Sequence, residues 1–303
     1  CLALLVVDEQ HRFGVHQRLS LVGKGKKNEL VPHQVIMTAT PIPRTLAMSS
    51  YGDLDCSVID ELPPGRLPIK TCLLSQTRRD ELVGKVFEHC MTGQQVYWVC
   101  TLVEESDVLE AQAAELAANE LRAALPDLNV GLVHGRMKSS EKEAAMHDFV
   151  TRETNVLVAT TVIEVGVDVP NATLMVIENP ERLGLAQLHQ LRGRVGRGKQ
   201  ASYCFLMYKN PLSQTARQRL SIMKDSQDGF YIAEQDLIMR GPGEVLGVRQ
   251  SGLMDFRVAD LLRDQSLIEG VSVHARRIAE QQPAVSDQLI ERWLQHTLQF
   301  AQV

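Results

Sequence analysis

Two acidic residues directly follow an apolar run at the start of the sequence. Asp8 and Glu9 come after residues 2–7, and His11 stands close behind them. If the apolar run is a buried strand, both carboxylates lie at its carboxyl end, where α/β sheets bind ligands. An aspartate in this position can hold Mg²⁺ on nucleotide phosphates, and a neighbouring glutamate can act as general base on the attacking water. Two solvated acids in a loop are an equally good interpretation, because such pairs are common.

A second cluster is made of arginines and glycines. Residues 190–197 read Gln-Leu-Arg-Gly-Arg-Val-Gly-Arg, so that Arg194 and Arg197 each follow a glycine. Guanidinium groups bind phosphate oxygens through paired hydrogen bonds, and glycine lets the backbone come close. Residues 181–200 carry five basic side chains and one acidic one, a local charge of 5 − 1 = +4. A solvated basic turn is the plainer alternative, but the pattern favours a phosphate-binding turn.

Three further segments follow predicted strands and are weak when taken singly. Residues 38–45 begin Thr-Ala-Thr-Pro, residues 132–138 include His134, and residues 159–170 include Thr160 and Thr161. Hydroxyls at a strand end also cap the next helix, and a histidine in a surface turn needs no ligand. These segments therefore gain weight only from their order along the chain.

Short apolar runs alternate with amphipathic segments over most of the chain. We expect strands at 2–7, 34–39, 69–74, 95–102, 129–134, 155–160, 173–178 and 202–208. We expect helices at 78–92, 107–125 and 140–150, the last with a capping box from Ser140 and Glu143. Alternation of this kind predicts an α/β fold with a parallel sheet covered on both faces. After about residue 210 only helices are expected, at 212–226, 258–281 and 285–300.

Composition limits the remaining possibilities. The 303 residues have a formal net charge of −5, so any basic surface is local. The six cysteines form no C-x-x-C pair, which excludes a zinc ribbon and a disulfide scaffold and favours a reducing, cytoplasmic location. No apolar run approaches the roughly 18 residues of a membrane span. Because Leu2–Val7 begins the chain as a buried strand, we expect a C-terminal fragment of a longer protein.

In this order, the segments resemble the motor of superfamily 2 helicases, and more closely the RecG family and its relative Mfd. Residues 8–15 and 38–45 carry the likeness to RecG, and residues 228–230, 237–247 and 249–252 resemble the translocation motif that RecG and Mfd share. The resemblance implies RecA-like lobes, with residues 1–62 as the C-terminal part of the first and residues 63–210 as the second. The proline-rich segment 62–68 then joins the lobes, and 211–303 form a helical translocation region.

The resemblance also implies roles at an ATP site. Asp8 would be the Mg²⁺ ligand and Glu9 the base that activates water. Arg194 and Arg197 would be arginine fingers on the γ-phosphate, with Gln190 beside it. Gly166 and Asp168 match positions near the nucleotide.

Other positions match the DNA path and the coupling elements. His134, Gly135, Arg136, Thr160 and Thr161 match residues along the nucleic-acid backbone, and their groups contact phosphates without reading bases. The positions that match coupling elements are His11, Thr38, Thr40, Arg219, Arg240 and Gln250.

The implied function is an ATP-dependent, Mg²⁺-dependent translocase on double-stranded DNA. It would remodel branched DNA, such as stalled forks and Holliday junctions, in repair and recombination. The sequence contains no G-x-x-x-x-G-K-[ST] and no junction-binding wedge domain, so we expect the chain alone to be inactive. The alternatives are a transcription-coupled repair translocase like Mfd and a DNA-binding module without hydrolysis.

Overall fold

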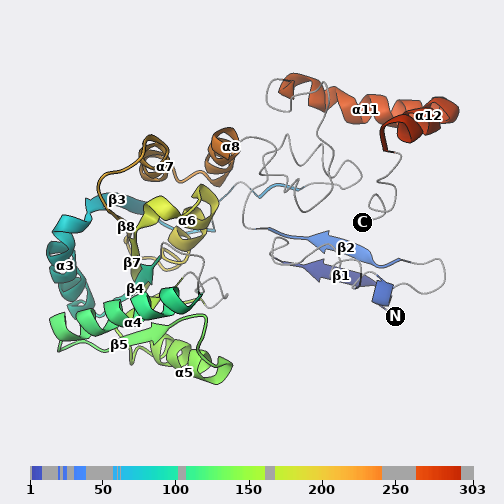
Figure 1. The fold of residues 1–303 in the computed structure, drawn as a ribbon. Helices are drawn as coiled ribbons and strands as arrows, with labels where there is room; N and C mark the ends of the chain where they lie inside the picture. Colours follow the sequence, from blue (N-terminus) through green and yellow to red (C-terminus); the bar gives the residue numbers. More distant parts are fainter. Residues whose placement is uncertain are drawn as a thin grey trace. The chain divides into compact units, whose positions relative to one another are not determined.

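The computed structural model describes most of the chain, in several ranges. These are residues 2–8, 20, 23–25, 31–38, 57–59, 61, 63–101, 107–160, 168–240 and 264–294. The chain divides into two compact units, residues 59–232 and residues 1–58 with 233–303. Figure 1 labels the elements of both units, and each unit is described by itself.

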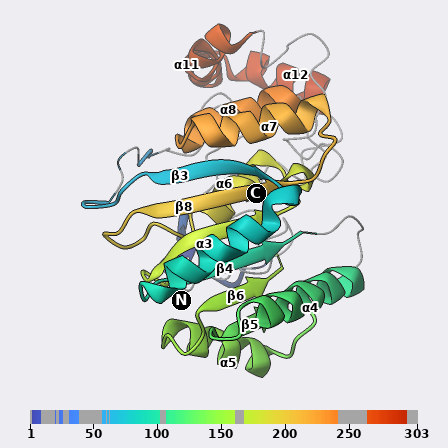
Figure 2. The same cartoon turned by 90° about the vertical axis from the view of Figure 1, so that its left-hand side faces the viewer.

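The larger unit is built on a six-stranded parallel sheet with the order β3-β8-β7-β4-β6-β5 (Figure 2). Its strands are β3 (Ile69–Ser75), β4 (Gln95–Cys100), β5 (Val130–Val133), β6 (Val156–Ala159), β7 (Ala172–Glu178) and β8 (Ser202–Tyr208). Every residue of β4, β6 and all but the last of β7 is buried, as expected for strands covered on both faces. The predicted α/β fold with a parallel sheet is therefore confirmed.

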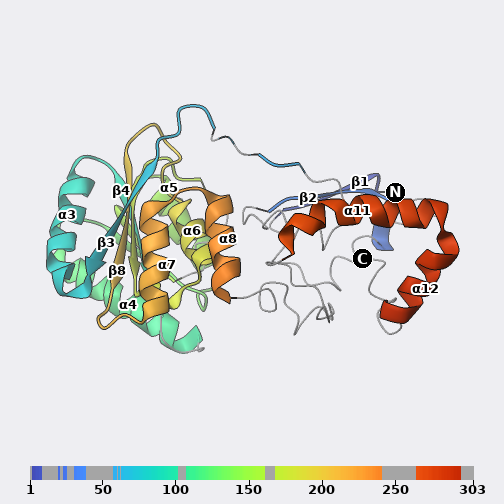
Figure 3. The ribbon, with the colours of Figure 1, turned by 90° about the horizontal axis from the view of Figure 1, so that it is seen from above.

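Helices cover both faces of this sheet. The helices α3 (Arg79–Met91) and α4 (Asp107–Ala124) pack on a core cluster that includes the fully buried Trp98. The preceding residue, Tyr97, points to the opposite face and packs on Phe149 of α5 (Ser139–Val150), with ring centroids 4.8 Å apart. Figure 3 shows α3 on one side of the sheet and α6 (Leu185–Arg192) and α7 (Gln214–Asp225) on the other.

The start of α5 differs from the predicted capping box. Lys138 is the N-cap, and its backbone N–H donates to Oε2 of Glu141 at 3.0 Å. Ser140 already lies inside the helix, because the backbone N–H of Met137 bonds to the carbonyl of His134 and that turn lets the helix begin at Ser139. The prediction that Ser140 and Glu143 form the box was wrong.

The smaller unit contains a two-stranded parallel sheet of β1 (Leu4–Val7) and β2 (His33–Ile36). Its helices are α11 (Gln265–Gln281) and α12 (Pro283–Leu294), and α8 (Gly229–Arg240) crosses the division between the units. In the ranges that the structure covers, no helix has the length and apolar character to cross a membrane.

Residues 63–68 form neither helix nor strand, in keeping with the predicted linker. Helix α7, which we assigned to the third region, lies against β3 in the larger unit. The division into residues 1–62, 63–210 and 211–303 stays a prediction.

Candidate functional site

The arginine- and glycine-rich segment forms a tight turn after α6. The backbone N–H of Gly193 donates to the carbonyl of His189, and that of Arg194 donates to the carbonyl of Leu191, both at 3.0 Å. Gly196 has a φ of +73°, and a Cβ atom there would lie 2.8 Å from Cγ1 of Ile69. Only glycine fits this backbone and this close approach. We call residues 193–197 the arginine turn.

The arginine turn brings an acid from another segment beside Arg197. Nη1 of Arg197 lies 3.6 Å from Oδ1 of Asp168, and its Nε donates to the carbonyl of Gly193 at 3.4 Å. Arg194 is half-buried on the same turn. Gln190 is half-buried on α6, one helical turn before Arg194. Asp168 and Arg197 are thus in contact, and Gln190 and Arg194 lie on the same stretch of chain, while the nucleotide roles that the resemblance implied for them stay predictions.

The charged residues of this turn affect the pKa of Tyr97. Burial raises its pKa to about 12, the cations of Arg197 and Arg194 oppose that rise, and the carboxylate of Asp168 adds to it. Two cations and one anion therefore act electrostatically on the same phenol. A partly exposed turn with an excess of guanidinium charge fits a phosphate group, which such groups bind through paired hydrogen bonds.

The arginine turn lies at the amino edge of the large sheet. A Cβ atom on Gly198 would be 2.7 Å from the carbonyl oxygen of Pro170, just before β7, and Gly196 approaches Ile69 and Ser202, where β3 and β8 begin. The rule that ligands bind at the carboxyl ends of strands does not describe this site.

Arg192 of the same motif is buried and bonds inside the protein. It is 2% exposed, and its Nη1 donates to the carbonyls of Met223 and Ser226 at 2.8 Å and to Oγ1 of Thr71 at 3.3 Å. Its Nη2 contacts Nδ1 of His189 at 3.0 Å. Arg192 therefore holds the end of α7 against α6, whereas Arg194 and Arg197 stay accessible.

His189 is held neutral by this arrangement. Burial, followed by the charge of Arg192, lowers the pKa of His189 to about 4, while Asp228 acts in the opposite direction. Because a guanidinium can only donate, Nδ1 of His189 must accept from Arg192 and carries no proton. Protonation would break this hydrogen bond and place two cations side by side.

We expect the stability of the chain to fall between pH 7 and pH 5 because of His189. Between its folded pKa of about 4 and its usual value of about 6.5, the unfolded chain binds the extra proton, so the free energy of unfolding rises with pH in that window. Between pH 7 and pH 5, the titration of His189 should lower the free energy of unfolding by about 2 kcal/mol. Urea unfolding, followed by Trp98 fluorescence in a Trp293→Phe background, measures it.

The variant His189→Gln keeps an acceptor for Arg192 but does not titrate, so its loss over the same pH range should be smaller by about 2 kcal/mol. His147→Gln, on the exposed face of α5, is the matched control and should behave like the parent chain. Equal losses in the parent and in His189→Gln would contradict the prediction.

Two buried polar atoms lie at the carboxyl edge of the same sheet. His134 and Thr160 directly follow the paired strand ends Val133 and Ala159, and they are 8% and 1% exposed. Nδ1 of His134 and Oγ1 of Thr160 have no hydrogen-bond partner among the described residues. A buried polar group left unpaired costs about 1–3 kcal/mol, so both atoms suit a ligand that supplies donors or acceptors here.

Gly135 and Arg136 follow His134 and are exposed. Nζ of Lys142 donates to the carbonyl of Gly135 at 2.6 Å, which adds a cation beside Arg136. Sequence reasoning missed Lys142 on α5, whose only signal is its spacing of one helical turn from Lys138 at the N-cap. Nε2 of His134 lies 3.5 Å from Oε1 of Glu115.

Asp8 and Thr38 lie at one edge of the small sheet. The parallel strands β1 and β2 end at Val7 and Ile36, and the backbone N–H of Met37 donates to the carbonyl of Val7 at 2.7 Å. Both predicted residues are exposed just beyond these ends. Carboxylate oxygen is a ligand that Mg²⁺ prefers, so the chemistry of Asp8 is compatible with the metal role, which stays a prediction. The remaining predicted residues lie outside the described residues: Glu9, His11, Thr40, Thr161, Gly166, Gln250 and the side chain of Arg240.

Arg219 joins α7 to the segment before α6. Its Nη1 donates to the carbonyl of Leu183 at 2.7 Å and its Nη2 to the carbonyl of Glu181 at 3.0 Å. Arg192 makes the reverse connection, from the end of α6 to the end of α7. We call these two contacts the α6–α7 clamp, and sequence reasoning did not find the part that Arg192 plays in it.

Comparison with known families identifies two regions of the chain. Residues 78–199 match the helicase conserved C-terminal domain, and residues 226–297 match domain 3, C-terminal, of the ATP-dependent DNA helicase RecG. The first match contains the arginine turn, and the second follows α7.

Curated relatives match almost the whole chain. It is 63% identical over 301 residues to the ATP-dependent DNA helicase RecG of Escherichia coli K12, covering 99% of this chain and 43% of the relative. It is 54% identical to the RecG of Acidithiobacillus ferridurans, covering 100% of this chain and 44% of the relative. The chain thus spans less than half the length of these relatives.

Solved structures show the same fold. A structure of RecG bound to a three-way DNA junction is similar over 88% of this chain and 34% of that chain, with 44% identity and a TM-score of 0.67. The yeast protein Dbp5 bound to RNA and ADP BeF3 has a TM-score of 0.52 over 78% of this chain and 62% of that chain, at 13% identity, which shows the fold alone.

Proposed function

Since the chain belongs to the RecG family of helicases, we propose that it is part of an ATP-dependent translocase that remodels branched double-stranded DNA. Its similarity to RecG over 99% of its length supports this assignment, as does the similar RecG structure, which holds a three-way junction. Stalled forks and Holliday junctions are the substrates we propose, with repair and recombination in the cytoplasm as the setting.

Arg194 and Arg197 would bind the terminal phosphate of ATP, with Gln190 beside it. The excess of guanidinium charge at the arginine turn favours a group that carries several negative oxygens. Asp8 would hold Mg²⁺, which neutralises phosphate charge when bound. Glu9 would take a proton from the attacking water. The sequence has no P-loop, so the chain alone is expected to hydrolyse no ATP.

The carboxyl edge of the large sheet would contact the DNA backbone. His134 and Thr160 supply buried atoms without partners in the described ranges, and Gly135 and Arg136 are exposed beside them. Hydroxyls, backbone N–H groups and cations contact phosphates without reading bases, which suits a motor that moves along any sequence.

The α6–α7 clamp supports coupling between hydrolysis and movement. Because α6 leads into the arginine turn, a shift of that turn on hydrolysis would be passed to α7 through Arg192 and Arg219. From α7 the chain continues into the region that matches RecG domain 3.

The observation that carries this proposal is the arginine turn with Asp168, in a chain 63% identical to a RecG. A module that only binds DNA would not need two accessible arginines at the sheet edge opposite the one proposed to contact DNA. An Mfd-like role in transcription-coupled repair is disfavoured by the matches to RecG domain 3 and to RecG relatives.

The function is tested by Arg240→Ala and Gln250→Ala in the full-length protein. Both residues lie in the segment that resembles the translocation motif, apart from the ATP motifs. We expect each variant to keep at least about half of the DNA-dependent ATPase rate and to lose about tenfold or more of fork unwinding, because hydrolysis continues but its movement no longer reaches the duplex. Parallel ATPase and fork-unwinding assays measure both activities.

Arg276→Ala, on the exposed surface of α11, is the matched control and should change neither activity. An equal fall of ATPase and unwinding in Arg240→Ala and Gln250→Ala would contradict coupling by these residues. Absence of any ATP-dependent unwinding in the full-length protein would contradict the proposed function itself.

A further inference from the structure

We propose that Arg66 is a positioning residue that holds the arginine turn in the geometry needed for ATP hydrolysis. Arg66 belongs to the linker segment that precedes β3, far from residues 193–197 in the sequence. None of the motifs of the proposed site contains it. The inference rests on the proposed function, because it assigns Arg66 to the same hydrolytic site.

The guanidinium of Arg66 binds the backbone of the arginine turn at two points. Its Nε donates to the carbonyl of Gly196 at 3.1 Å, and its Nη2 donates to the carbonyl of Gly193 at 3.4 Å. The carbonyl of Gly193 directly precedes Arg194, and the carbonyl of Gly196 directly precedes Arg197. A planar guanidinium offers two donors in a fixed orientation, so this contact fixes the backbone of both phosphate-binding candidates at once.

The local backbone of Arg66 is itself held in place. Gly65 has a φ of +81°, and the backbone N–H of Arg66 donates to the carbonyl of Pro63 at 3.2 Å, which forms a turn. Further on, the backbone N–H of Ile69 donates to Oε1 of Gln227 at 2.9 Å. Arg66 therefore acts from a local turn that leads directly into β3, whose first residue is bonded to Gln227.

Electrostatics adds a second effect of Arg66 on Arg197. The pKa of Arg66 is lowered, first by burial and then by the charge of Arg197, while Asp168 acts in the opposite direction. The two guanidinium groups repel each other, and Gly193 accepts hydrogen bonds from both. Arg66 thus occupies the inner side of the turn, and Arg197 is kept on the accessible side, next to Asp168. An arriving phosphate would relieve this repulsion.

Arginine fingers in phosphate-transferring enzymes act mainly in the transition state. Misplacing the arginine turn should therefore lower kcat more than it raises KM. In the full-length protein we expect Arg66→Gln to lower the kcat of DNA-dependent ATP hydrolysis about tenfold or more, with the KM for ATP changed by less than about threefold. Arg66→Lys keeps the positive charge but lacks the paired donors of a guanidinium. Its kcat should lie between those of the parent protein and Arg66→Gln.

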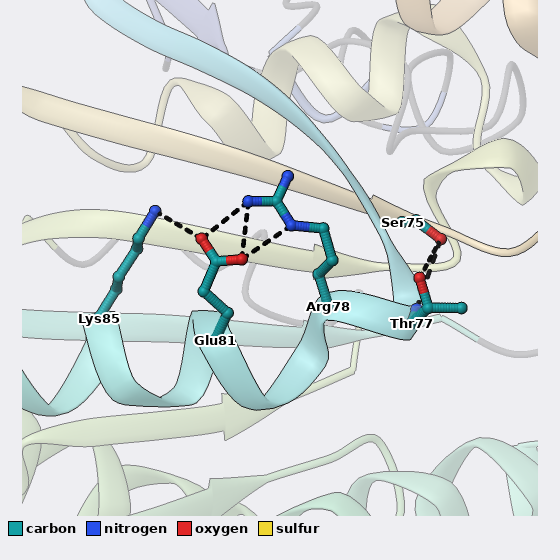
Figure 4. A network of polar contacts seen from close by, with 5 residues as sticks. All are labelled: Ser75, Thr77, Arg78, Glu81 and Lys85. Carbon is teal, nitrogen blue, oxygen red and sulfur yellow. Dashed lines mark hydrogen bonds and ion pairs between the residues drawn. The ribbon is translucent and has the colours of Figure 1, made fainter.

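Arg78→Gln is the matched control. Figure 4 shows Arg78 at the start of α3, paired with Glu81, which also contacts Lys85. The two Arg78–Glu81 hydrogen bonds are both 2.8 Å long, but they lie on an exposed helix face of the same unit. Loss of this arginine should leave kcat and KM unchanged.

A double-mutant cycle tests whether Arg66 acts through the two arginines of the turn. If it does, adding Arg66→Gln to the variant Arg194→Lys/Arg197→Lys should slow that variant by no more than about twofold. A merely structural role would make the two losses multiply, and that result would overturn the inference. If Arg66→Gln does not fold, judged by its thermal melting, the same cycle with Arg66→Lys decides.

The outcomes also separate this inference from the proposed function. A normal kcat in Arg66→Gln, together with a defective Arg197→Ala, would overturn the role of Arg66 alone. A normal kcat in Arg197→Ala would contradict the proposed function, and the role of Arg66 would fall with it.

Discussion

Replacement of Arg197 by alanine in the full-length protein should lower the kcat of DNA-dependent ATP hydrolysis by about 10³-fold or more. Arg197 is accessible on the arginine turn, oriented by Asp168 at 3.6 Å and by the carbonyl of Gly193. A guanidinium there would stabilise the charge that builds on the phosphate oxygens during transfer, an interaction stronger in the transition state than in the bound substrate. Steady-state ATPase measurements at saturating DNA give kcat and KM separately.

Lys199→Ala is the matched control, since Lys199 is an exposed cation two residues further along the same segment. It should retain kcat within about twofold, because a neighbouring charge without the turn's geometry contributes little. A kcat in Arg197→Ala close to that of Lys199→Ala would show that Arg197 does not act on the phosphate.

Glu9→Gln should abolish ATP turnover, by about 10³-fold or more, while ATP and DNA binding are retained. The amide has the size and the hydrogen-bonding capacity of the acid, but it cannot accept the proton of an attacking water. Equilibrium binding of a fluorescent ATP analogue and of fork DNA, measured beside steady-state ATPase, separates the two effects. This expectation rests on the position of Glu9 after the apolar strand and beside Asp8 in the sequence.

Glu88→Gln, on the exposed surface of α3, provides the control for loss of a carboxylate. If Glu9→Gln hydrolysed ATP at a rate near that of Glu88→Gln, Glu9 would not be the base. If Glu9→Gln lost ATP binding as well, the residue would belong to the binding of the nucleotide rather than to the activation of water.

The two candidate sites of the larger unit lie at opposite edges of one sheet. His134 and Thr160 follow strand ends, whereas the arginine turn lies where strands begin. The fully buried strands β4 and β6 between them can keep both edges in a fixed relation, so that under the proposed function a nucleotide at one edge and a DNA backbone at the other would act on the same body.

The sequence by itself determined the elements of the larger unit and the chemistry available to them. All six strands predicted there are present, with ends shifted by no more than about two residues, because buried parallel strands are continuous apolar runs. The arginine- and glycine-rich pattern of residues 190–197 likewise predicted a turn, which the structure contains, while its binding of phosphate stays a prediction. The start of α5 was misjudged, since a backbone turn from His134 to Met137, rather than local capping preference, decided where the helix begins.

Only the tertiary structure decided which members of a motif stay accessible and which are buried and hold the protein together. Three arginines within residues 192–197 look alike in the sequence, but Arg192 is buried against α7, whereas Arg194 and Arg197 remain accessible. The contact of Arg66 with the arginine turn joins residues 127 and 130 positions apart in the chain. Neither fact follows from local pattern, because burial and long-range hydrogen bonding depend on which strands become neighbours in the sheet, and β3 pairs with β8 rather than with β4.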